Sequence, residues 1–254
     1  MNNPIVVIGI GEIGSVFARG FLRTGHPVYP VTRDMNLQDA AQHTPDPELV
    51  LIAVGETALP EILAQLPEQW RAKVALIQNE LLPVDWKTQG YNNPTVMSVW
   101  FEKKPGQDVK VVVPSPAYGP HSRVLIEALQ ALNIPAIQLE DEARLLFELV
   151  RKNYYILTTN IAGLRVAGTV SELWHKHEEL ARSVAADVHR IQSHLTGEKL
   201  DHEKLIAAMV TAFEGDPDHQ CMGRSAPARL DRALDIAAKA HLDVPALQTI
   251  KQSL

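Results

Sequence analysis

The sequence predicts two domains of unlike class: an α/β Rossmann domain with a doubly wound, mainly parallel sheet, followed by an all-α domain. Short apolar runs alternate with helical stretches up to about residue 140, and a glycine-rich turn follows the first run. Beyond that point the strand-like runs disappear and only helical patterns remain. We therefore expect domains at residues 1–140 and 141–254.

The strand candidates of the first domain begin as continuous apolar runs, which is typical of parallel strands covered on both faces. They lie at residues 5–8, 28–32, 49–54, 74–77, 95–100, 110–113 and 136–139. Helices are expected between them at residues 13–24, 56–65 and 121–132, and the segment 115–120 is interpreted as a loop. This alternation implies right-handed crossovers between parallel strands.

The second domain is expected to consist of helices alone. Their patterns cover residues 141–167, 170–196, 199–213, 226–241 and 245–254. Gly168, Gly197 and the turn at residues 215–217 separate them, because glycine and proline interrupt helices.

The composition limits the kinds of molecule that the protein is expected to bind. The net charge of −6 argues against a nucleic-acid partner, and the single cysteine excludes an intramolecular disulfide. No run approaches the roughly 18 apolar residues that span a bilayer, and the first strand begins too early for a signal segment. We expect a cytoplasmic protein with a small-molecule substrate and no membrane partner. The residues 175–179 (HKHEE) are interpreted as a solvated helix face rather than a metal site.

The strongest motif directly follows the first strand and opens a helix. Gly9 permits a tight turn, Gly11 leaves room for a pyrophosphate, and Gly14 allows close packing of helix on strand. The N–H groups of the helix start and its positive dipole end attract phosphate. We therefore predict a dinucleotide site formed by Gly9, Ile10, Gly11, Glu12, Ile13 and Gly14.

Residues after the second strand favour NADP(H) over NAD(H). A basic residue there accommodates a 2′-phosphate, whereas an acidic residue accepts a hydrogen bond from the ribose hydroxyl. Arg33 stands nineteen residues after Gly14, and Thr32 can add a hydroxyl contact. Asp34 leaves a ribose contact open as an alternative, as does an exposed Arg33 without a ligand role.

Together these motifs resemble the ketopantoate reductase (2-dehydropantoate 2-reductase) family, of which this chain looks like a divergent member. The resemblance covers nearly the whole chain and implies a helical domain similar to that of the 6-phosphogluconate dehydrogenases. It implies an oxidoreductase that uses NADPH to reduce a small 2-keto acid or a related carbonyl compound. Homodimerisation through the helical domain is one oligomeric state that this architecture allows.

The resemblance also implies roles for individual residues. Lys152 matches the catalytic lysine, which donates a proton or polarises the carbonyl. Asn79 matches a residue that contacts nicotinamide and substrate, and Asn160 and Ser225 match substrate-binding positions. Helical geometry places Lys152 and Asn160 on one side of a helix, together with Ile156, Thr159 and Gly163.

Two departures from the family pattern keep other functions open. Ile156 stands where the family has an asparagine, and Pro227 where it has a glutamate; Pro227 instead suits the first turn of a helix that Ser225 would cap. Ketopantoate itself is therefore not the expected substrate. The alternatives are a catalytically degenerate NADP-binding sensor or interaction protein, and a dehydrogenase acting on an imine or a β-hydroxy acid.

Overall fold

The computed structural model describes residues 2–254 and divides into two compact units between Glu148 and Leu149. The division falls within helix α7 (Glu142–Val166), whose first turns belong to the first unit. Sequence patterns placed the expected boundary near residue 140, where the last strand ends. No helix within residues 2–254 combines the length and apolar character needed to cross a membrane.

The first unit is built on a sheet that has seven strands within the described residues, in the order β2-β1-β3-β4-β5-β8-β9. The first five strands pair in parallel, and β8 then runs antiparallel to β5 and parallel to β9. The strands are β1 (Ile5–Ile8), β2 (Val28–Val31), β3 (Leu49–Ile52), β4 (Val74–Leu76), β5 (Thr95–Met97), β8 (Ser115–Tyr118) and β9 (Ala136–Gln138).

The central strands are buried on both faces, which explains their continuous apolar runs. Ile5 and Val7 of β1 belong to the core that faces α1 (Glu12–Arg23) and α6 (Ser122–Gln130), and Val6 and Ile8 are buried on the opposite face. Pro30, which lacks an N–H donor, lies in the edge strand β2, where a missing ladder bond is tolerated.

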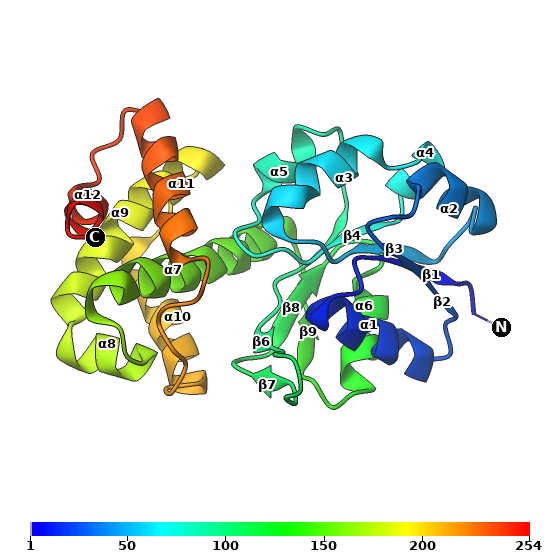
Figure 1. The fold of residues 1–254 in the computed structure, drawn as a ribbon, viewed down its shortest axis with the longest axis horizontal. Coiled ribbons are helices and arrows are strands. Elements are labelled where there is room, and N and C mark those ends of the chain that lie inside the picture. Colours follow the sequence, from blue (N-terminus) through cyan, green and yellow to red (C-terminus); the bar gives the residue numbers. More distant parts are fainter. Residues whose placement is uncertain (1) are drawn as a thin grey trace. The chain divides into compact units, whose positions relative to one another are not determined.

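Helices cover both faces of this sheet (Figure 1). On one face α1 and α6 pack closely because Gly20 has no side chain: a Cβ atom there would lie 2.4 Å from the carbonyl oxygen of Ala128. The shorter helical segments of the unit lie on the other face in Figure 1; they are α2 (Leu37–His43), η1 (Glu56–Ala58), α3 (Leu59–Gln65), α4 (Glu68–Arg71) and α5 (Pro83–Lys87).

Two sequence predictions for the first unit were wrong in the same region. The strand expected at residues 110–113 is only β7 (Lys110–Val111), which pairs with β6 (Phe101–Glu102) in a separate two-stranded sheet. The segment expected as a loop at residues 115–120 contains β8 of the main sheet. Pro116 is accommodated there because its carbonyl still accepts a hydrogen bond from Ser98 N–H (2.9 Å). The hairpin returns the chain locally, so β8 lies antiparallel to β5 without a helical crossover.

The second unit is helical, as predicted. Its helices, after the part of α7 that belongs to it, are α8 (Val170–Lys176), α9 (Glu178–Thr196), α10 (His202–Gly215), α11 (Ala226–Lys239) and α12 (Pro245–Gln252). The single helix expected at residues 170–196 is instead two, because His177 leaves the helical region (φ −138°, ψ 35°). No glycine or proline marks this break in the sequence. The break lets α8 pack against α9.

A buried carboxylate on α9 binds the start of the last helix, α12. Asp187 of α9 accepts hydrogen bonds from the backbone N–H groups of Ala246 (2.8 Å) and Leu247 (3.1 Å), and so supplies the cap that the start of α12 lacks locally. Arg190 forms an ion pair with the same carboxylate.

Candidate functional site

The glycine loop has the backbone geometry that its sequence predicts. Gly9 adopts a positive φ of 94°, and its N–H donates to the carbonyl of Val31 at the end of β2 (3.0 Å). A Cβ atom at Gly9 would lie 2.9 Å from the carbonyl oxygen of Ala53, and one at Gly14 only 2.0 Å from that of Gly9. Larger residues at these two positions would therefore push α1 away from the sheet.

Gly11 marks the place where a ligand can approach the loop. It is the N-cap of α1, and no side chain caps the helix. Apart from the adjoining residues of the chain, no heavy atom lies within 4 Å of the position that a Cβ atom at Gly11 would take, so the space beside it is open. The first N–H groups of α1 have no acceptor inside the helix, and they lie beside this space. The loop therefore fits the pyrophosphate of a dinucleotide.

Arg33 lies at the same edge of the sheet as the glycine loop. β1 and β2 are parallel and in register from Ile5–Val28 to Ile8–Val31, so the residues after both strands emerge together. Thr32 and Arg33 are exposed in a turn where Met35 N–H donates to Thr32 O (3.1 Å). Within residues 2–254 no carboxylate forms an ion pair with Arg33. Its guanidinium is available to an anion near the loop.

Asn79 follows β4 at this edge and is exposed. Its neighbour Gln78, which the sequence analysis missed, is buried and donates to the carbonyls of Ile52 (2.7 Å) and Val54 (3.2 Å) at the end of β3. Gln78 thereby fixes the segment that carries Asn79. A polar residue directly after a buried strand was the available signal.

In the second unit, Lys152 has a strongly lowered pKa. Burial lowers its pKa from 10.5 to about 7, and the positive charges of Arg229 and Arg151 contribute in the same direction. Arg151 turns its guanidinium to the carbonyl of Ala208 (3.0 Å). A lysine whose pKa lies near neutral pH can both donate and accept a proton under physiological conditions.

Arg229 is the residue of this cluster that the sequence analysis missed. Its Nη1 donates to Oδ1 of Asn160 (2.8 Å), which links α11 to α7. The Asn160 amide nitrogen donates to the carbonyl of Cys221 (3.1 Å), and Gly163 permits this contact because a Cβ there would lie 2.9 Å from the Cys221 Cβ. The available signal was an arginine near the start of a helix whose first turn has no acidic residue.

Ser225 and Pro227 lie at the start of α11, and Ile156 lies on α7. Ser225 is exposed at the N-cap of α11, one turn before Arg229, but its hydroxyl makes no cap hydrogen bond, so the predicted capping role was wrong. Its backbone is already helical (φ −86°, ψ −2°), which turns the side chain away from the free N–H groups. Pro227 lies in the first turn, as expected, and Ile156 is buried on α7.

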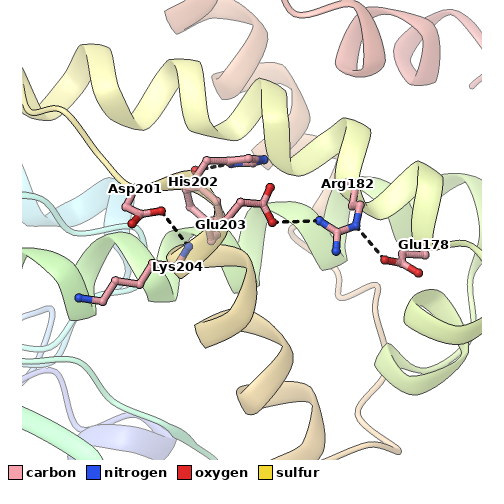
Figure 2. A network of polar contacts seen from close by, with 7 residues as sticks. Glu178, Arg182, Asp201, His202, Glu203 and Lys204 are labelled. Carbon is pink, nitrogen blue, oxygen red and sulfur yellow. Dashed lines mark hydrogen bonds and ion pairs between the residues drawn. The ribbon is translucent and has the colours of Figure 1, made fainter.

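Charged side chains near the start of α9 form one ion pair within that helix and one with α10. Arg182 of α9 pairs with Glu178 one turn before it (2.8 Å) and with Glu203 of α10 (3.5 Å), as Figure 2 shows. Asp201 caps α10 by accepting from the Lys204 N–H (3.0 Å). These are exposed ion pairs and a helix cap, and we assign no chemistry to them.

Comparison with known proteins identifies the fold. No protein-family model matches the chain, and no curated protein matches it by sequence. Solved structures do: a dimeric ketopantoate reductase from Staphylococcus aureus is 16% identical, covers 97% of this chain and 96% of its own, and has a TM-score of 0.67. A 2-dehydropantoate 2-reductase from Methylococcus capsulatus is 13% identical, covers 97% and 94%, and has a TM-score of 0.70.

A third similar structure is D-mandelate dehydrogenase in complex with NADH, which is 13% identical, covers 98% of this chain and 96% of its own, and has a TM-score of 0.68. The resemblance found in the sequence is thereby confirmed for the fold, over nearly the whole chain.

Proposed function

We propose that this protein is an NADPH-dependent reductase of a small 2-keto acid or a related carbonyl compound. The observation that carries the proposal is Lys152, a partly buried lysine with a pKa of about 7, set beside Arg229 in the helical unit. The open glycine loop of the first unit supports the use of a dinucleotide. Solved relatives in fold act on a 2-keto acid or its alcohol, as their names state.

The proposed chemistry divides between the cofactor and the side chains. When bound, the cofactor supplies a hydride to the carbonyl carbon. Lys152 donates a proton to the carbonyl oxygen as negative charge develops there, and a pKa near the working pH suits this role. Arg229 binds the carboxylate, because its planar fork matches two carboxylate oxygens.

Asn160 acts in this proposal as a positioning residue. Its oxygen already accepts from Arg229 and its nitrogen donates to Cys221 O, so the amide holds the guanidinium in place. Ile156, one turn from both Lys152 and Asn160 on α7, places a buried apolar side chain where the family has a polar one. A substrate with an apolar side chain therefore suits the site better than one with a hydroxyl group. Asn79 and Ser225 stay predicted substrate contacts.

The preference for NADPH rests on Arg33. An exposed arginine after β2 provides charge for a 2′-phosphate, while Asp34 next to it would serve a ribose hydroxyl. The D-mandelate dehydrogenase of similar fold binds NADH, so the fold by itself does not select one cofactor.

The test is a panel of 2-keto acids with aliphatic and aromatic side chains, assayed by NADPH oxidation. The expected result is turnover of at least one apolar 2-keto acid. Lys152→Met should lower kcat/KM by about 100-fold or more, the usual contribution of a general acid. Arg229→Met should mainly raise KM, by about tenfold to 100-fold, because a charge-assisted carboxylate contact is lost. The matched control Lys199→Met removes an exposed lysine of the same unit and should change neither constant.

No turnover across the panel would refute the reductase. If the protein then still bound NADPH tightly, the alternative of an NADP-binding sensor or interaction protein would stand, which the replacement of polar family positions by Ile156 and Pro227 favours. Reduction of an imine, or oxidation of a β-hydroxy acid, would point to the third class considered above.

A further inference from the structure

We propose that Lys103 binds the phosphates of the dinucleotide at the glycine loop. Its Nζ lies 3.1 Å from a carboxylate oxygen of Glu12, the first residue of α1 and the neighbour of Gly11. This lysine lies far from the glycine motif in sequence, and no motif indicates it. The inference rests on the proposed function, because it concerns the same cofactor.

The small hairpin β6–β7 places Lys103 there. Phe101 of β6 is buried against Phe17 of α1, with ring centroids 6.2 Å apart. Side chains two residues apart in extended chain point to the same side, so Lys103 follows Phe101 toward α1. The core contact therefore fixes the hairpin against the helix, and the lysine reaches the helix start.

The local contacts hold Lys103 in this position. Its side chain is only 20% exposed, and its Nζ also donates to the carbonyl of Lys104 (2.8 Å). Lys104 differs in both respects: it is 55% exposed and pairs with Glu102 (3.0 Å), away from the loop. Two adjacent lysines thus carry the same charge but only one of them meets the glycine loop.

Glu12 places a negative charge at the start of α1, next to the glycine loop. Because Glu12 directly follows Gly11, its carboxylate would repel an incoming pyrophosphate unless a cation neutralises it. Lys103 neutralises Glu12 and can donate its one remaining N–H to a phosphate oxygen, since an ammonium group has three donors and two of them already have acceptors. The pair Glu12–Lys103 therefore combines with the free N–H groups of α1 into one phosphate-binding surface.

The experiment measures the affinity of the full chain for NADPH and NADH by calorimetry, in wild type and in three single variants. Lys103→Ala should weaken both dinucleotides by about tenfold, because both contain the pyrophosphate and one charge-assisted contact is lost. The matched control Lys104→Ala should stay within about twofold of wild type. Arg33→Ala should weaken NADPH alone, because only NADPH has the 2′-phosphate.

A second background separates contact from simple charge neutralisation. If Lys103 contacts phosphate, Lys103→Ala still weakens binding when Glu12→Gln has removed the carboxylate. If it only neutralises Glu12, the effect of Lys103→Ala disappears in that background, and the proposed contact is overturned. Equal affinities of Lys103→Ala and Lys104→Ala also overturn it. A wild-type protein that binds neither dinucleotide refutes the cofactor proposal itself, whereas normal wild-type binding with an unaffected Lys103→Ala variant refutes this inference alone.

Discussion

Replacing Lys152 by methionine should make the protein more stable while it destroys the proposed activity. The pKa of Lys152 falls from 10.5 to about 7 in the folded chain. At 1.36 kcal/mol per pH unit this corresponds to a ceiling of about 5 kcal/mol of unfavourable free energy for the charged lysine. Lys152 keeps part of its surface in contact with solvent, and screening reduces the penalty. We therefore expect Lys152→Met to raise the free energy of unfolding by about 1–3 kcal/mol at neutral to acidic pH.

The sign of the pH dependence follows from the direction of the shift. A base with a lowered folded pKa binds fewer protons when folded, so the penalty is fully present below about pH 7 and is relieved as the pH rises toward 10.5. The gain of Lys152→Met should therefore be largest near pH 6 and less than half as large near pH 9.

Urea denaturation of both proteins at the two pH values measures this difference. The exposed Lys199→Met variant is the control and should differ from wild type by no more than about 0.5 kcal/mol at either pH. A Lys152→Met variant less stable than wild type near pH 6, or a gain that does not change with pH, would refute the assignment of Lys152 as a destabilised buried cation.

Two further predictions concern the pH profile and the helix packing. The kcat/KM of the reduction should fall about tenfold per pH unit above about pH 7, because Lys152 must be protonated to act as the acid. A kcat/KM that does not change between pH 6 and pH 9 would contradict this. Gly20→Ala should destabilise the protein by about 1–3 kcal/mol, since its Cβ would lie 2.4 Å from Ala128 O. Thermal unfolding measures that loss, and an unchanged or higher melting temperature would contradict the proposed close packing of α1 on α6.

The features that the sequence determined by itself are local. Apolar patterns predict the strands β1 to β5 and the helices of the second unit. The glycine turn follows from glycines that avoid short-range steric clashes. Arg33 was predicted from its position shortly after the second strand, whereas Asn79 was predicted from the family resemblance; both follow parallel strands of the same sheet. Lys152 and Asn160 could be assigned to one helix face because helical spacing is regular.

Contacts between distant segments were decided only by the tertiary structure. β8 was mistaken for a loop because its pairing partners, β5 and β9, lie outside any local pattern. Arg229 meets Asn160 only because α11 packs on α7, and Lys103 meets Glu12 only because Phe101 anchors a hairpin to α1. Local sequence encodes propensity and spacing, whereas these pairs depend on which surfaces the core brings together. The pKa of Lys152 belongs to the same class: lysine is ordinarily a strong base, and burial, with Arg229 and Arg151 nearby, lowers its pKa to about 7.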